Sequence, residues 1–209
     1  MNHEYAHQHL SESDPRMAEL IARSRRYDIA ASASVRPLDA LAESIAYQQL
    51  SGKAAAKIWS RVRALYPRKY LDPNLLLATP DEQLRTAGLS RSKIAALKDL
   101  ASKTIDGTVP SARALSRMSD DEIIARLTMV RGIGRWTVEM LLLFDLGRPD
   151  VWPVHDYGVQ KGFAKTFRRR KLPTPKQLLK FGERWRPYRS VAAWYCWRAL
   201  DGPGKSQEG

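Results

Sequence analysis

Two glycines in the middle of the chain lie where backbone amides could bind an anion. Gly132 and Gly134 belong to the short segment Arg131–Gly134, which has apolar positions at helical spacing on both sides. Glycine permits a positive φ and leaves no side chain in front of the amides, and amides at the start of a helix can hold a phosphate oxygen. The pattern predicts a phosphate-binding turn, although an ordinary helix–helix turn is the simpler explanation of a Gly-x-Gly pair taken alone.

Three acidic residues near this turn are candidates for acid–base or electrostatic catalysis. Asp156 precedes a helical run, where aspartate usually caps the helix. Glu139 and Asp145 are the rival acids, and we expect both to occupy ordinary exposed helix positions. From the residues alone, helix capping is the main interpretation of Asp156.

Helical signals recur along the chain, and no stretch alternates apolar and polar residues over even six positions. Ser119–Glu122 forms a capping box before the helix that leads into the turn, and Thr79–Glu82 forms a second one. Asp14–Pro15, Pro37 and Ser90 mark further helix starts. The sequence therefore predicts an all-α fold.

The turn and its surroundings resemble a known enzyme family. The run Gly132–Thr137, Gly-Ile-Gly-Arg-Trp-Thr, is similar to the hairpin of the helix-hairpin-helix DNA glycosylase superfamily, specifically its alkylation-repair branch of 3-methyladenine DNA glycosylase II enzymes. Asp156 lies 20 residues after Trp136, the offset at which this superfamily carries a catalytic aspartate. Two further segments that resemble the branch are residues 45–54 and 183–190.

The resemblance implies an all-α fold of two helical lobes with the active site in the cleft between them. Residues 37–150 would form the central lobe, which contains the helix-hairpin-helix at residues 119–146. Residues 1–36 would pack with the C-terminal lobe, residues 151–209, which carries Asp156.

The chemistry implied by the resemblance is hydrolysis of the bond between a base and deoxyribose. Positive charge builds on the sugar as the base departs, so a fixed carboxylate helps more than a strong nucleophile. Asp156 would supply this carboxylate and position or deprotonate the attacking water. Relatives that also cut the DNA backbone carry a Schiff-base lysine where this chain has Trp136, and an indole forms no imine. We expect a monofunctional enzyme, since Lys161 and Lys165 lie outside the matching position.

Aromatic residues are expected around the target base, which must be flipped out of the duplex and stacked. By resemblance Trp136, Tyr157 and Trp197 line this pocket, with Tyr47 and Gln49 as further candidates. Electron-rich rings favour a cationic purine methylated at N3 or N7. Core packing is the alternative explanation for each aromatic residue.

Other positions gain expected roles from the same resemblance. Met140 stands where some relatives carry an aromatic residue, which would make the pocket wider or more tolerant. Arg91 is the expected side chain that fills the gap left by the flipped base, although a surface arginine without a role explains it almost as well. The residues expected to bind the DNA backbone are Gly132, Gly134, Arg135 and Thr137. The backbone carbonyls expected to hold a sodium or potassium ion are those of Thr128, Val130 and Ile133.

The formal net charge of +13 is concentrated toward the C-terminus. From Tyr157 onward the chain has 13 basic and 3 acidic residues, a surplus of ten. Such a surplus favours a polyanion, because neutralising phosphates releases counterions. The run Arg168–Lys171 is either part of this field or a solvated helix end. We expect double-stranded DNA as the partner, since a membrane-binding segment would need a second, apolar signal and none is visible.

The single cysteine, Cys196, excludes an intramolecular disulfide and a cysteine-ligated iron–sulfur cluster, and we expect a buried thiol and no required cofactor. The sequence shows neither a leader pattern nor an apolar stretch of membrane-spanning length. It predicts a monomer that is cytoplasmic and nucleoid-associated. The terminus with His3, His7 and His9 is expected to be frayed and polar rather than a metal site.

The main prediction is a monofunctional DNA glycosylase that excises alkylated purines from duplex DNA and starts base excision repair. One alternative is a glycosylase for deaminated or cyclised bases. A more distant alternative is a non-catalytic helix-hairpin-helix module that only binds DNA. The position of Asp156 relative to the turn argues against this last interpretation.

Overall fold

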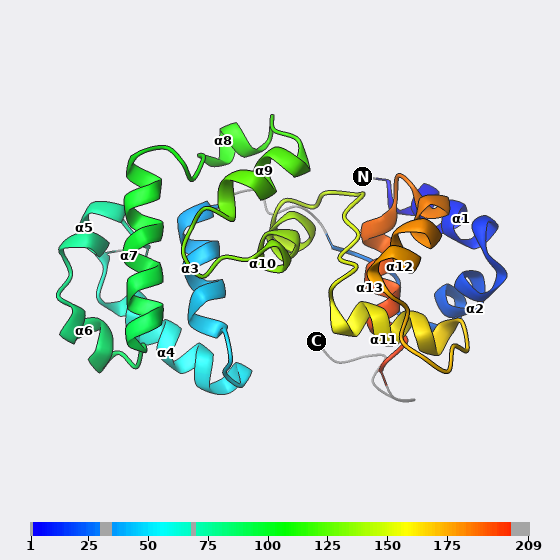
Figure 1. Cartoon of the computed structure of the whole chain (residues 1–209), viewed down its shortest axis with the longest axis horizontal. Helices are drawn as coiled ribbons and strands as arrows, with labels where there is room; N and C mark the ends of the chain where they lie inside the picture. The colour runs from blue at the N-terminus through cyan, green and yellow to red at the C-terminus, as the bar shows by residue number, and fades with distance from the viewer. Residues whose placement is uncertain (1, 30–34, 68–69, 202–209) are drawn as a thin grey trace. The chain divides into compact units, whose positions relative to one another are not determined.

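The computed structural model describes residues 2–29, 35–67 and 70–201. Every regular element in these ranges is helical and none is a strand, so the predicted all-α class is confirmed (Figure 1). Over the same ranges, no helix is both long and apolar enough to cross a membrane.

Contacts between Cα atoms divide the chain into two compact units, with residues before 32 and from 142 onward in one unit and the residues between them in the other. The helices of the N- and C-terminal unit are α1 (His3–Ser13), α2 (Pro15–Arg23), α11 (Tyr157–Thr166), α12 (Pro175–Gly182), a 3₁₀ turn (Glu183–Trp185) and α13 (Arg189–Arg198). The helices of the central unit are α3 (Pro37–Tyr47), α4 (Gly52–Ala64), α5 (Pro73–Ala78), α6 (Asp81–Thr86), α7 (Arg91–Ile105), α8 (Ala112–Leu115), α9 (Asp120–Leu127) and α10 (Arg135–Met140).

The central unit ends at Leu141, earlier than the boundary near residue 150 that the sequence predicted. A π-helical turn, Leu141–Asp145, follows α10 without a break. Beyond it, Ser190 of α13 donates through Oγ to the Arg148 carbonyl at 2.6 Å and accepts from the Val151 N–H at 2.9 Å. These bonds tie the segment after the π-helical turn to α13.

The N-terminal residues form helices that pack against α13 in the same unit. His7 Nε2 lies 3.1 Å from the hydroxyl of Tyr195, which also accepts from the Tyr27 N–H at 3.3 Å. Burial of the ring and the nearby charge of Arg26 lower the pKa of His7. The predicted frayed terminus is therefore wrong, because α1 has a buried face that includes His7 and Leu10.

Helices α11 and α13 approach each other closely along a line of small residues. A Cβ atom at Gly162 would collide with the carbonyl of Cys196, so only glycine fits there. Cys196 is fully buried, as predicted. Burial and the nearby charge of Asp156 raise the pKa of its thiol well above the usual range. One turn earlier in α11, Gly158 lies against Trp197, so the two glycines set the distance between the helices.

The predicted helix caps had different outcomes. The capping box at Ser119 is confirmed: its Oγ accepts from the Glu122 N–H, and the Glu122 carboxylate accepts from the Ser119 N–H at 2.8 Å. The box predicted at Thr79 is wrong, because Thr79 ends α5 instead of starting α6. Its hydroxyl donates to the Leu75 carbonyl at 2.7 Å.

Candidate active site and nucleic-acid interface

The turn between α9 and α10 contains two glycines in different conformations. Gly132 has a φ of +78°, which glycine adopts readily and other residues do not. Gly134 has a φ of −95° and is the N-cap of α10, so it does not use the positive φ that glycine permits. A Cβ atom at Gly134 would meet nothing within 4 Å. The second glycine therefore leaves open space in front of the first amides of α10.

Side chains from α3 and α7 hold this turn in place. Asp99 of α7 accepts from the Arg131 N–H at 2.7 Å and from Lys103 Nζ at 2.6 Å. Gln48, the C-cap of α3, donates through Nε2 to the Gly132 carbonyl at 2.9 Å. Burial alone would raise the pKa of Asp99, but the two hydrogen bonds and the charges of Lys103 and Arg131 lower it. The turn is thus anchored by contacts with α3 and α7 that no local sequence pattern predicts.

An ion pair runs along one side of α10. Arg135 Nε lies 2.9 Å from Glu139 Oε1, and the Glu139 residue is only 2% exposed. The predicted exposed position of Glu139 is wrong, because α10 buries the three consecutive residues Thr137–Glu139. The Arg135 side chain still reaches solvent, whereas Thr137 is buried.

The residues of this unit that were predicted to select a base are all partly or fully accessible. Trp136 is 50% exposed in the first turn of α10, and Met140 is half-buried at its end. Tyr47 is the last residue of α3, and Gln49 follows with a φ of +57°. Such a φ costs a non-glycine residue about 1–2 kcal/mol. Gln49 was predicted from the sequence, but its neighbour Gln48, which binds the turn, was not.

The remaining predicted positions of this unit lie at helix ends. Arg91 is exposed and opens α7. Thr128 is the C-cap of α9, and the Val130 carbonyl accepts from the Ile133 N–H at 3.0 Å. A carbonyl oxygen has two lone pairs, so the Val130 carbonyl keeps one for a cation. The binding of a monovalent cation by these carbonyls stays a prediction.

Asp156 caps α11 in the other unit and is 8% exposed. Its Oδ1 accepts from the Val159 N–H at 2.7 Å and from the indole Nε1–H of Trp197 at 2.8 Å. Gly158 permits the second bond, since a Cβ atom there would lie 2.7 Å from the Trp197 ring. The Asp156 carboxylate therefore caps the helix and is also the candidate catalytic group, and two hydrogen-bond donors fix its orientation.

Aromatic rings accompany Asp156 within this unit. Trp197 stacks on Phe144 with a centroid distance of 5.5 Å and an interplanar angle of 25°. Tyr157, directly after Asp156, is 64% exposed, and Lys161 Nζ lies 5.9 Å from its ring centroid. Phe144 was not predicted as a site residue, because a π-helical turn changes which residues share a face and leaves no pattern in the sequence.

Asp145 ends the π-helical turn and is half-buried, so its predicted exposure is also wrong. Burial raises the pKa of its carboxyl. A raised pKa accompanies many catalytic acids and also simple desolvation. Asp145 is therefore the rival acid that an experiment must exclude.

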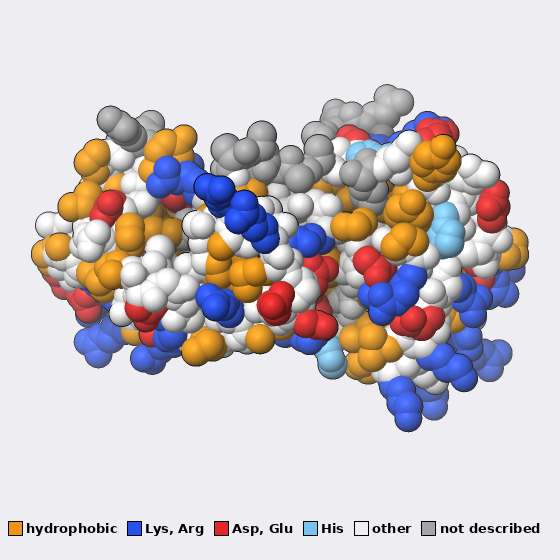
Figure 2. Space-filling model, turned by 90° about the horizontal axis from the view of Figure 1, so that it is seen from above, with side chains coloured by type: hydrophobic (Ala, Val, Ile, Leu, Met, Phe, Trp, Pro, Cys, Tyr) orange, Lys and Arg blue, Asp and Glu red, His pale blue; other side chains and the backbone are white. Residues whose placement is uncertain are grey.

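Basic side chains are common on the described surface. Figure 2 shows Lys and Arg side chains among hydrophobic ones on one face of the molecule. The run Arg168–Lys171 directly follows α11, and the Arg169 N–H donates to the Ala164 carbonyl at 2.8 Å, which closes the helix. The run therefore lies just beyond a helix end, and its contribution to a DNA-binding positive field stays a prediction.

The predicted site residues fall into two sets, one in each unit. The carboxylate set is Asp156, Tyr157 and Trp197, to which the structure adds Phe144. The second set is the α9–α10 turn and α10 together with Tyr47, Gln49 and Arg91 of the same unit, and the structure adds Gln48 and Asp99 to it.

The sequence is similar to that of base excision repair proteins. The family described as HhH-GPD superfamily base excision DNA repair protein matches residues 42–187, which include the turn and Asp156. DNA-3-methyladenine glycosylase 1 of Schizosaccharomyces pombe is 40% identical over 163 residues, or 78% of this chain and 72% of that protein.

Two solved structures have the same fold and related sequences. The 3-methyladenine DNA glycosylase of Schizosaccharomyces pombe in complex with abasic DNA has a TM-score of 0.80 and 37% identity, over 92% of this chain and 95% of the other. The DNA-3-methyladenine glycosidase of Bacillus halodurans has a TM-score of 0.84 and 32% identity, over 93% and 88%. The chain therefore belongs to the HhH-GPD superfamily of base excision DNA repair proteins, as the resemblance of its hairpin predicted.

Proposed function

We propose that this protein is a DNA glycosylase that hydrolyses the N-glycosidic bond of alkylated purines in duplex DNA and so initiates base excision repair. The names of its relatives, which are 3-methyladenine DNA glycosylases, support this substrate class. The observation that carries the proposal is the buried carboxylate of Asp156, held by the Val159 N–H and the Trp197 indole beside the exposed ring of Tyr157.

A fixed carboxylate matches the charge that this reaction develops. As the bond breaks, its electron pair leaves with the purine and the deoxyribose approaches an oxocarbenium ion. A preorganised anion near C1′ stabilises this state more than the ground state. Asp156 supplies the anion, orients the water that adds to C1′ and accepts its proton. The product is an abasic site.

Tyr157 and Trp197 contact the excised base in this proposal. A cationic methylated purine is attracted to aromatic rings by about 0.5–2 kcal/mol, and it is also a better leaving group than an unmodified purine. The further base-selecting residues in this proposal are Trp136, Met140, Tyr47 and Gln49.

The α9–α10 turn binds the DNA backbone in this proposal. The amides of α10, in front of which Gly134 leaves open space, donate to a phosphate oxygen. Arg135 contacts the duplex backbone, and Arg91 fills the gap left by the flipped base. A monovalent cation held by the carbonyls of Thr128, Val130 and Ile133 would supply further positive charge to the phosphate.

We also propose that the enzyme has no lyase activity and acts as a monomer. Trp136 stands where the resemblance places a Schiff-base lysine in lyase relatives, and its indole forms no imine. Hydrolysis consumes only water, so the reaction calls for no redox cofactor. Because the substrate is DNA, the enzyme would act where the DNA of the cell lies.

The test is base release from a duplex that carries N3- and N7-methylated purines. The parent protein should release methylpurines and leave alkali-labile abasic sites, and borohydride should trap no covalent complex. Asp156→Asn keeps the helix cap, because asparagine also accepts the Val159 N–H, but removes the charge. It should lower the single-turnover rate at least about 100-fold, with less than about a threefold change in duplex affinity.

Asp145→Asn is the matched control, since it makes the same change in the rival half-buried acid. This variant should release bases at the parent rate. Equal rates for the parent and Asp156→Asn would overturn the role of Asp156, and a loss confined to Asp145→Asn would transfer that role to Asp145. A parent protein that binds duplexes but releases no base would be a DNA-binding module.

A further inference from the structure

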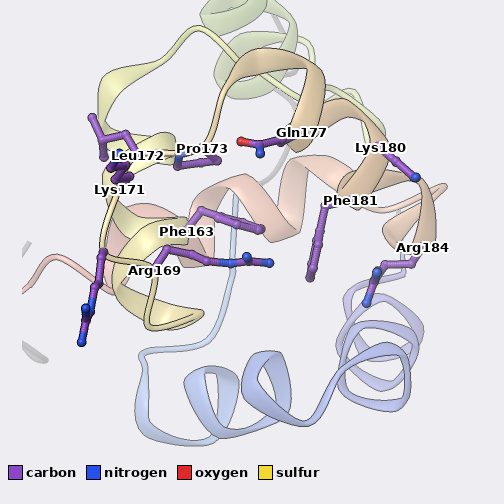
Figure 3. Close-up of a pocket in the computed structure, with 10 residues that line it drawn as sticks. Phe163, Arg169, Lys171, Leu172, Pro173, Gln177, Lys180, Phe181 and Arg184 are labelled. Atoms are coloured by element: carbon purple, nitrogen blue, oxygen red, sulfur yellow. The ribbon is translucent and has the colours of Figure 1, made fainter.

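A pocket of about 510 Å³ lies at the C-terminal end of α11 (Figure 3). Asp156 caps the opposite end of this helix. The 10 residues of α11 rise about 15 Å along the helix axis, so the pocket is separate from the candidate catalytic carboxylate. No role proposed above uses it.

Basic side chains form the rim of this pocket, except that of Arg169, which reaches across it toward Phe181 (Figure 3). The five basic lining residues are Arg169, Arg170, Lys171, Lys180 and Arg184. In the part of the chain that the structure describes, only Arg184 among them has an ion-pair partner, Asp14 at 3.6 Å. The single acidic residue between positions 168 and 184 is Glu183, which pairs with Arg186 at 2.9 Å. The rim therefore presents several positive charges without matching carboxylates.

Apolar side chains form the floor of the same pocket. Phe163 stacks on Phe167 with a centroid distance of 4.4 Å, and the guanidinium of Arg184 lies 3.8 Å from the ring centroid of Phe181. One face of each lining ring is thus already covered. Leu172, which is 45% exposed, adds an accessible aliphatic side chain. Phe163 is almost fully buried, so the apolar surface open to a ligand comes from the half-buried Phe181 and from Leu172. The floor therefore offers no slot in which a base could stack between two rings.

We propose that this pocket binds an acidic peptide segment of a partner protein that carries one large apolar side chain. Carboxylates of the segment would form charge-assisted hydrogen bonds with the rim, and the apolar side chain would be buried against Phe181 and Leu172. A DNA backbone satisfies the rim but leaves the apolar floor without a partner. The volume lies in the range of small ligand sites, which suits one anchoring side chain and its neighbours.

The probe is a short fluorescein-labelled peptide of Asp and Glu residues with one central Phe. Fluorescence anisotropy at about 0.15 M salt should show saturable binding to the whole protein. Replacing the Phe of the peptide by Ser should weaken binding about tenfold, because the buried apolar area is lost. Replacing its acidic residues by Asn and Gln should abolish binding.

Matched variants separate the pocket from the general positive field. Arg170→Gln with Lys171→Gln removes two charges from the rim, whereas Arg168→Gln with Lys176→Gln removes two from the same basic segment outside the pocket. All four positions are exposed, so both proteins should keep the parent melting temperature. The rim variant should bind the peptide at least about tenfold more weakly, and the control variant less than about threefold. Leu172→Ser should weaken binding of the Phe peptide and leave that of the Ser peptide unchanged.

Binding of an undamaged DNA duplex, measured in parallel, tests whether DNA phosphates occupy the pocket instead of a peptide. Both double variants should lower duplex affinity by a similar factor, because each removes two charges. Equal weakening of peptide binding by the two variants would overturn the proposal, as would a parent protein that does not bind the peptide. Duplex affinity lost only in the rim variant, without peptide binding, would assign the pocket to phosphates.

Discussion

Oδ1 of Asp156 receives hydrogen bonds from two different structural elements. The Val159 N–H belongs to α11 itself, and the Trp197 indole belongs to α13. The first bond would orient the carboxylate in an isolated helix, whereas the second exists only when α13 is packed in place. The orientation of the proposed catalytic group therefore depends on tertiary packing through one side chain.

Trp197→Phe should separate this hydrogen bond from aromatic contact. Phenylalanine keeps a ring to stack on Phe144 but has no N–H to donate to Asp156, so kcat for methylpurine release should fall about tenfold with little change in KM. Trp194→Phe makes the same change three residues earlier in α13 and should leave kcat unchanged. Equal kcat values for both variants and the parent would show that the indole donor does not position the carboxylate.

Asp145 should make the stability of the protein depend on pH. Burial raises its folded-state pKa above the unfolded value. The free energy of unfolding is therefore unaffected when both states are protonated, and it falls as the pH rises from the unfolded pKa through the folded pKa. Asp145→Asn should therefore raise the melting temperature at pH 7 by about 1–3 °C, and this gain should vanish as the pH falls below about 4. Melting curves across this range test the sign, and a gain that is larger in acid than at pH 7 would contradict it.

The role of a single residue was predictable from the sequence where a nearby motif fixed its position. Asp156 could be selected because the turn resembles the hairpin of a family that carries its catalytic aspartate at this offset, and its capping geometry follows from the helix after it. Glu139 and Asp145 could not, because their burial depends on which face of a short helix meets the rest of its unit. Gln48 and Asp99 reach the turn from distant helices, so no spacing within the turn points to them.

Among the helical elements, the α9–α10 turn offers the clearest test of DNA binding. Gly134→Asp places a side chain and a negative charge where a phosphate would approach, and it should weaken binding to damaged and undamaged duplexes at least about tenfold. Gly52→Asp is the matched control, since Gly52 also opens a helix and a Cβ atom there also meets nothing within 4 Å.

Both aspartates lie at helix N-termini, where a negative charge is favourable, so both proteins should stay folded. Electrophoretic mobility shifts with the two duplexes provide the measurement. Unchanged affinity of Gly134→Asp would show that the turn is not a phosphate-binding site.

Helix ends were predictable where one local pattern dominated. The side chains of Ser119 and Glu122 each accept a hydrogen bond from the backbone N–H of the other residue. This capping box therefore depends only on neighbouring residues. At Thr79 the same spacing was misleading, since the preceding helix α5 ends at this residue and uses its hydroxyl. The π-helical turn after α10 has no signature in the sequence, although it determines where Phe144 points.

At the scale of the whole molecule, the net charge of +13 should control the affinity for DNA. A plot of log K against log salt concentration should have a slope between about −3 and −6, which corresponds to roughly three to seven neutralised phosphates. Fluorescence titrations of one undamaged duplex between about 0.05 and 0.25 M salt provide the slope, and melting curves in the same buffers confirm that the protein stays folded. A slope near zero would mean that the charge surplus is not used on the DNA backbone.

The sequence predicted that the N- and C-terminal residues share one unit, but it placed the end of the central unit near residue 150 instead of at Leu141. Helical periodicity and caps indicate how many helices form, whereas the boundary at Leu141 follows from bonds between α13 and the segment after the π-helical turn. Such bonds join residues about forty positions apart, and a single sequence does not reveal them.

Burial of the Cys196 thiol should protect the protein from the methylating chemicals whose damage to DNA it is proposed to repair. Those chemicals also modify thiolates, which are the reactive form of cysteine. Full burial against Gly162 removes access, and the raised pKa removes the thiolate. The repair protein therefore carries no reactive sulfhydryl in its folded state, and Cys196 would become vulnerable only after α11 and α13 separate.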